Sequence, residues 1–174
     1  MRRYARQDFL RHRVGSRRMA VARAERSSDY RELVAPAGAI IPDCVTFTNG
    51  PLSYVVFETR TVVLDRSLPL FDLAFAYGHE LGHLFDHENL GDEDRARFAA
   101  TLGRSADDWW EAPYEKRPSE AFATAFALLS CPGPWRNRYV SGAYWQPQRR
   151  DDVLAMCRAV IVAASGRQGQ LSRE

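Results

Sequence analysis

The run His79-Glu80-Leu81-Gly82-His83 constrains this chain more than any other feature of its sequence. On a helix, residues four apart project from the same face, about 5–6 Å apart at Cβ, so the two histidines can converge on one metal ion. Glu80 is turned by about 100° from His79. It therefore lies beside the open coordination position, where a carboxylate can accept a proton from metal-bound water. The motif predicts a helix that carries two zinc ligands, His79 and His83, with Glu80 as general base.

A catalytic zinc usually has three protein ligands and one water, so a third ligand is needed. The extended metzincin pattern would require a glycine at Asp86 and a ligand at Asn89, and this chain therefore does not follow it. His87 lies about 12 Å beyond His79 on a straight helix. It could bind the same ion only if the helix broke after His83.

Three carboxylates further along the chain remain as candidates, and they are Glu93, Asp94 and Glu120. The first two follow a turn at Gly91. Glu120 stands near the start of an apolar helix, where a lone carboxylate needs a partner that a zinc ion can supply. Small residues would let this helix pack closely on the first: Ala121, Ala123 and Ala125. We predict Glu120 as the third ligand; the alternative is that its charge only stabilises the helix N-terminus.

The remaining pattern predicts a small α+β domain, with a short antiparallel sheet packed on the metal-binding helix and further helices. We expect the strands to form an antiparallel meander whose first hairpin turns at Asn49-Gly50. These strands are expected at residues 44–48, 52–57 and 61–64. Helical spacing follows Pro69 and returns at residues 92–102, at residues 118–129 and after Asp151. Beyond Gly166 we expect a frayed tail.

The first 26 residues differ from the rest of the chain in charge. They hold nine arginines against Asp8 and Glu25, although the whole chain has a net charge of only +2. We therefore divide the chain into an Arg-rich helix or arm (1–30), a zincin-like domain (31–166) and a flexible tail (167–174). The arm suits an acidic partner, nucleic acid or an anionic surface, and the simpler alternative is a solvated basic helix.

Composition also bears on the cellular compartment in which this chain is expected. It has no run of about 18 apolar residues, so no membrane span is predicted. The basic N-terminus lacks the apolar h-region of a secretory signal, which indicates a cytoplasmic protein. The cysteines are odd in number and far apart, and we expect buried, reduced thiols at Cys44, Cys131 and Cys157.

Together these residues resemble the gluzincin-type HExxH metallopeptidases, in particular the short ImmA/IrrE-like peptidases of bacteria and phages. The resemblance covers roughly residues 62–129: a strand, the helix with the two histidines and the later helix with Glu120. It implies that His79, His83 and Glu120 bind zinc and that Glu80 is the general base. It also implies that an edge strand beside the helix, residues 61–64 or its neighbour, holds extended substrate by backbone pairing.

The resemblance implies a zinc endopeptidase that acts on a protein or peptide partner in a bacterial or phage-infected cell. An alternative is a peptidase-derived, zinc-containing binding or structural component of a larger assembly. In that case the Arg-rich arm would contact nucleic acid or an acidic partner. Three tyrosines are available to stabilise an oxyanion beside the metal: Tyr114, Tyr139 and Tyr144.

Overall fold

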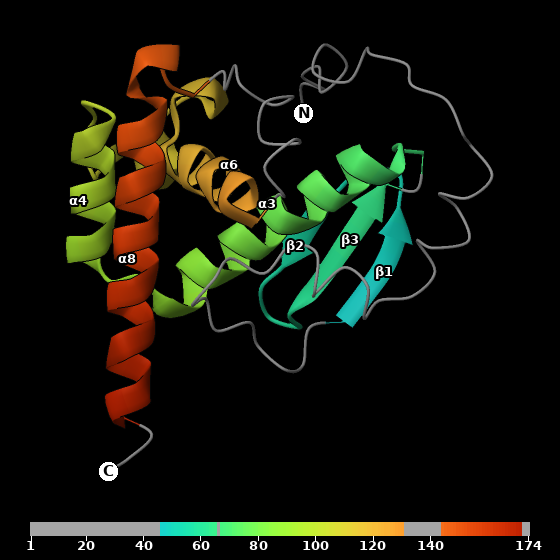
Figure 1. Cartoon of the computed structure of the whole chain (residues 1–174). Helices are drawn as coiled ribbons and strands as arrows, with labels where there is room; N and C mark the ends of the chain where they lie inside the picture. The colour runs from blue at the N-terminus through green and yellow to red at the C-terminus, as the bar shows by residue number, and fades with distance from the viewer. Residues whose placement is uncertain (1–45, 66, 131–143, 172–174) are drawn as a thin grey trace.

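A computed structural model of the chain describes residues 46–65, 67–130 and 144–171. Three strands come first: β1 (Thr46–Gly50), β2 (Tyr54–Val56) and β3 (Thr61–Asp65). The helices follow: α3 (Leu70–Asn89), α4 (Asp92–Thr101), α5 (Asp108–Glu111), α6 (Pro118–Ser130) and α8 (Arg150–Leu171), with short 3-10 helices η1 (Tyr114–Lys116) and η2 (Pro147–Arg149). The fold is α+β, as the sequence predicts. Helix α3 crosses the middle of the molecule, between the sheet and the other long helices (Figure 1).

The sheet differs from the predicted meander. Its strand order is β1-β3-β2; β2 is antiparallel to β3, as expected, but β1 is parallel to β3. The hairpin prediction at Asn49-Gly50 is therefore wrong. A type I′ turn needs positive φ at its glycine, and among the described glycines only Gly103 has it. Gly50 instead packs on β3, where a Cβ would lie 2.6 Å from the Val63 side chain.

Strand β3 is the centre of the sheet, so residues 61–64 are not the edge strand that the resemblance implied. Among the residues that the structure describes, the two edges are β1 and β2. Of these, β2 lies against α3 together with β3. The edge strand that contacts the histidine-bearing helix is therefore β2, the neighbour of residues 61–64.

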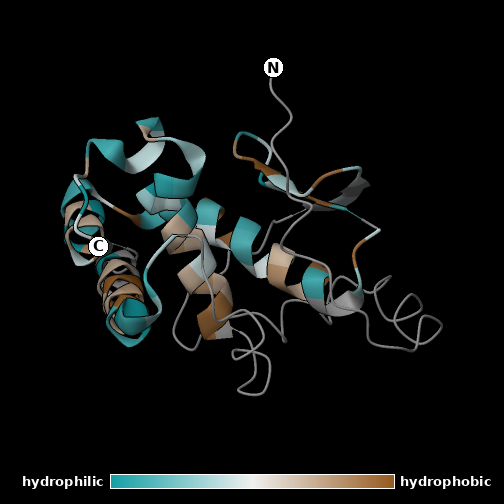
Figure 2. Ribbon diagram, turned by 90° about the horizontal axis from the view of Figure 1, so that it is seen from above, coloured by the Kyte–Doolittle hydropathy of each residue, from teal (hydrophilic) through white to brown (hydrophobic). Residues whose placement is uncertain are grey.

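The core lies where α3, α6 and α8 meet. Its largest buried side chains are aromatic and aliphatic, among them Tyr77, Phe98, Phe122, Phe126 and Ile161. Helix α8 packs against α4 and α6, and apolar and polar residues alternate around its turns (Figure 2). Cys157 is fully buried on this helix, as predicted, and burial raises the pKa of its thiol. Cys44 and Cys131 lie outside the described residues.

The C-terminal boundary also needs correction. Helix α8 continues to Leu171, beyond the start of the predicted tail at residue 167. Arg167 forms an ion pair with the buried Asp94 of α4, which ties this part of the helix to the body of the protein. The Arg-rich arm (1–30) lies outside the described residues. Within those residues, none of the helices combines the length and apolar character needed to cross a bilayer.

Candidate metal centre

His79 and His83 lie one turn apart on α3 and face the same way. Both are buried, and their Nε2 atoms are 3.2 Å apart. Their rings meet edge to face, with centroids separated by 4.8 Å. The Nδ1 atom of His79 lies 3.2 Å from the Thr124 hydroxyl of α6. A proton on Nδ1, donated to that hydroxyl, leaves the Nε2 lone pair free for a metal ion.

Glu120 brings the third donor from α6. One carboxylate oxygen lies 3.2 Å from His79 Nε2, and the other lies 3.5 Å from His83 Nε2. Taking one donor atom from each residue, the three atoms lie within 4.8 Å of one another, close enough to be ligands of a single ion. His79, His83 and Glu120 thus form a buried group that could hold a metal ion.

The charges within this group also fit a bound cation. Burial would raise the pKa of Glu120, but hydrogen bonds and charges from the two histidines outweigh it and hold that pKa far below its usual range. Burial would lower the pKa of His83, but Glu120, with Glu80 and Asp86, leaves it raised. A carboxylate that keeps its charge in a buried site attracts positive charge, and a metal ion could supply that charge in place of a proton on the histidines.

A close contact between two helices brings Glu120 to the histidines. Gly82 of α3 faces α6, where a Cβ on Gly82 would lie 2.8 Å from Ala123 Cα and 3.0 Å from Phe126 Cβ. The predicted close packing at the small residues of α6 is therefore present, and Gly82 is its counterpart on α3. Any larger residue at this position has to push the two helices apart.

We predict that Gly82→Ala lowers the free energy of unfolding by about 1–2 kcal/mol and weakens metal binding, because overpacking moves α6 and Glu120. The matched control is Gly166→Ala on α8, where nothing lies within 4 Å of the added Cβ. That substitution should be neutral or gain roughly 0.5–1 kcal/mol from helix propensity. Urea unfolding of both variants measures the difference. A Gly82→Ala protein as stable as Gly166→Ala would contradict the packing argument.

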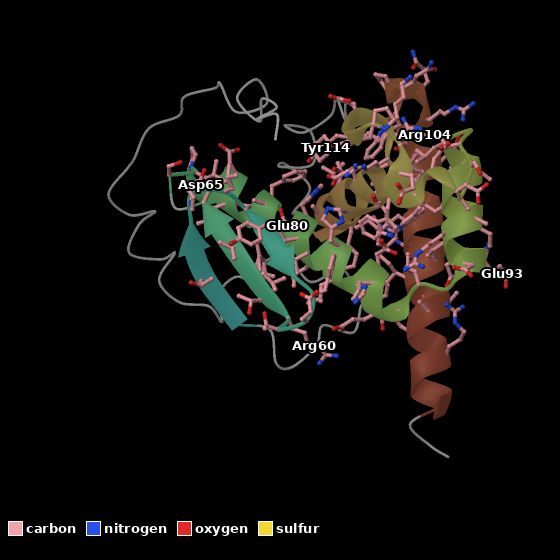
Figure 3. All side chains as sticks on the ribbon, turned by 180° about the vertical axis from the view of Figure 1, so that it is seen from behind. Arg60, Asp65, Glu80, Glu93, Arg104 and Tyr114 are labelled. Carbon is pink, nitrogen blue, oxygen red and sulfur yellow. The ribbon has the colours of Figure 1, made fainter. Side chains whose placement is uncertain are left out.

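Glu80 follows His79 on α3 and is 3% exposed. Its side chain lies in the middle of the molecule, between the sheet and the other helices (Figure 3). The charge of Glu80 contributes to the raised pKa of His83, so this carboxylate acts electrostatically on His83. A buried carboxylate beside two metal ligands, but outside the ligand group, is the arrangement that the sequence motif predicts.

The other candidate ligands lie elsewhere. Helix α3 continues unbroken past His83, and the exposed His87 packs against Phe57 with ring centroids 4.4 Å apart. Asp94 accepts a hydrogen bond from the Gly91 backbone and pairs with Arg167, as described above. Glu93 is exposed on the same helix, α4. Within the described residues, none of these three joins the histidine pair.

Two of the three tyrosines considered for oxyanion stabilisation lie among the described residues. Tyr114 is 41% exposed, and its ring lies 6.2 Å from that of Tyr144. Tyr139 lies outside the described residues. Thr124, by contrast, was not predicted, and it supports His79 directly. The sequence did contain a signal for this role, because Thr124 is a polar residue in an apolar helix, one turn after Glu120.

A second missed residue is Asp86, which is fully buried one turn after His83. It accepts hydrogen bonds from the Trp109 indole at 2.8 Å and from Arg95 Nε at 2.9 Å. Burial is the largest influence on Asp86 and raises its pKa, against the opposing effects of Trp109 and Arg95. Asp86 therefore joins α3 to α4 and α5 just beyond the two histidines.

Comparisons with protein-family models, with curated proteins and with solved structures give no match for this chain. The likeness to HExxH peptidases consequently rests on the residues themselves: His79, Glu80, His83 and Glu120.

Proposed function

We propose that this protein is a zinc-dependent endopeptidase, with His79, His83 and Glu120 as zinc ligands and Glu80 as general base. The observation that carries the proposal is the convergence of two imidazoles and one carboxylate beside a second, buried carboxylate. Three protein ligands of this kind leave a fourth position open, as catalytic zinc sites do. A purely structural site would be closed by four ligands and would need no base.

Zinc, when bound, would polarise a peptide carbonyl and lower the pKa of water to about 7. The residues of this chain supply the rest. The Glu80 carboxylate accepts the proton that the attacking water loses and returns it to the departing amine. The Thr124 hydroxyl keeps the His79 ring oriented, and Glu120 holds the negative charge that offsets the cation.

The substrate in this proposal is an extended peptide that pairs with the edge strand β2. Within the described residues this strand is at the edge of the sheet, and it lies against α3, the helix that carries the two histidines. Backbone pairing with an edge strand binds peptides of many sequences, since it uses only main-chain groups. The proposal also includes a protein or peptide substrate in a bacterial or phage-infected cell. Contact of residues 1–26 with nucleic acid or an acidic partner belongs to the alternative, a zinc-containing binding or structural component of a larger assembly.

Zinc-dependent cleavage of an unfolded protein tests this function. We expect the full chain, loaded with one equivalent of zinc, to cleave reduced and unfolded casein or a pool of extended peptides. A chelator should abolish cleavage and added zinc should restore it, with new peptide termini identified by mass spectrometry. Cleavage that persists when zinc has been removed would contradict the proposal. Full zinc loading without cleavage of any substrate would favour a structural or binding role.

A further inference from the structure

Two consecutive tryptophans on the short helix α5 have opposite environments. Trp109 is 3% exposed and belongs to the core, whereas Trp110 is 37% exposed. A large aromatic side chain left in water forgoes roughly 25 cal/mol for each Å² that burial would remove from solvent. Isolated exposed aromatic residues are ordinary, so the position of Trp110 decides what its exposure means.

Trp109 fixes the position of its neighbour. Its indole N–H donates to the buried Asp86 carboxylate, which Arg95 also holds. Its ring packs edge to face on Phe98, with centroids 6.0 Å apart, and against Phe122 at 6.2 Å. With Trp109 held by a hydrogen bond and by two rings, the backbone of α5 is held too. The backbone of Trp110 is therefore held in place by the contacts of Trp109.

Trp110 lies at the metal centre. Its ring centroid is 6.0 Å from that of His83, and 6.4 Å from that of Phe57, which it meets edge to face. Phe57 in turn packs against His87. We call Phe57, His87 and Trp110 the aromatic wall. Phe57 directly follows β2, so the wall connects the substrate edge strand to the His83 side of the metal centre.

Two charged residues close to the wall in the sequence form an ion pair with each other. Arg60, at the turn after β2 (Figure 3), and Glu88, beside His87 on α3, form an ion pair at 2.6 Å. The Glu88 side chain is largely buried in this contact, with 16% exposed. Arg60 and Glu88 thus cancel each other's charge, and the rings of Phe57 and Trp110 carry none. The surface favours an uncharged, apolar side chain.

We propose that Trp110 and Phe57 form the subsite for a bulky apolar or aromatic side chain of the substrate, next to the scissile bond on the His83 side. This inference rests on the proposed peptidase function. The same peptide that pairs with β2 would place a side chain against Phe57 and Trp110. Aromatic surface buried in this way typically dominates the selectivity of a binding site.

Binding and cleavage of a peptide series test the subsite separately from the chemistry. The probes are fluorescently labelled decapeptides of one extended sequence, with Phe, Leu, Ala or Glu at one central position. Equilibrium binding is measured by anisotropy to the full chain carrying Glu80→Gln, and cleavage is measured with Glu80 intact. Trp110→Ala, Trp110→Phe and the distant control Val162→Ala are compared in both forms. Val162 is 57% exposed on α8.

We expect the protein with Trp110 intact to prefer the Phe and Leu peptides over Ala and Glu. Trp110→Ala should weaken binding of the Phe peptide about tenfold, which corresponds to 1.4 kcal/mol, and leave the Ala peptide unchanged. Trp110→Phe should retain most of the preference, Val162→Ala all of it, and zinc content should not change. Equal loss for all peptides, or no preference to begin with, would overturn the subsite. Selective binding without any cleavage would retain the subsite and reject the peptidase.

Discussion

Glu80→Gln should leave the fold and the bound zinc intact and reduce peptide hydrolysis by about 10²–10⁴-fold. The amide has almost the shape of the carboxylate, so a side chain that is 3% exposed can be replaced without a cavity or a clash. The amide cannot accept a proton from the attacking water, and the general-base contribution is lost. Turnover of a cleavable peptide at saturating concentration measures the effect.

Glu93→Gln is the matched control, because it removes a glutamate charge from an exposed position on α4. Its activity should equal that of the unmodified protein. Zinc content and the melting temperature of both variants show whether any loss is catalytic. Undiminished turnover in the Glu80→Gln protein would reject Glu80 as the base and favour the structural role for the metal.

Glu120→Ala should weaken zinc binding by orders of magnitude. The substitution removes the only carboxylate of the ligand group and leaves two histidines, too few for a stable catalytic site. It also removes the anion that compensates the ion's charge in a buried setting. Competition with a chromophoric chelator measures the affinity. Because Glu120 is buried, circular dichroism of the metal-free protein should accompany the measurement and establish that the variant is folded.

His87→Ala provides the contrast, since His87 is on the same helix but exposed and outside the ligand group. This variant should keep a full equivalent of zinc. The opposite pattern, with zinc retained by Glu120→Ala and lost by His87→Ala, would show that the third ligand has been assigned to the wrong residue.

The helix α3 and its two histidines were predictable because their relation is local. Positions four apart on a helix meet whatever the rest of the fold does. The apolar pattern around Glu120 likewise predicted a packed helix with a carboxylate that needs a partner. Sequence left His87, Glu93 and Asp94 as alternatives. The structure separates them through contacts between distant segments: Asp94 pairs with Arg167, and His87 packs against Phe57.

The sheet could not be predicted to the same degree. Strand-forming residues and an Asn49-Gly50 pair mark where strands begin and end, but the partner of a strand is set by non-local packing. In this fold β1 crosses over to pair with β3, so Gly50 is needed for close packing rather than for a turn. The same limit applies to Trp110 and Thr124, whose roles depend on where α5 and α6 sit against α3.

The central claim is a single zinc ion held by His79, His83 and Glu120. Elemental analysis of the full chain, purified without added metal and then dialysed against zinc-free buffer, tests it most directly. We expect one equivalent of zinc per chain in this protein and almost none in the Glu120→Ala variant. A chain that is folded yet retains no zinc, and takes up none when zinc is supplied in slight excess, would contradict the account.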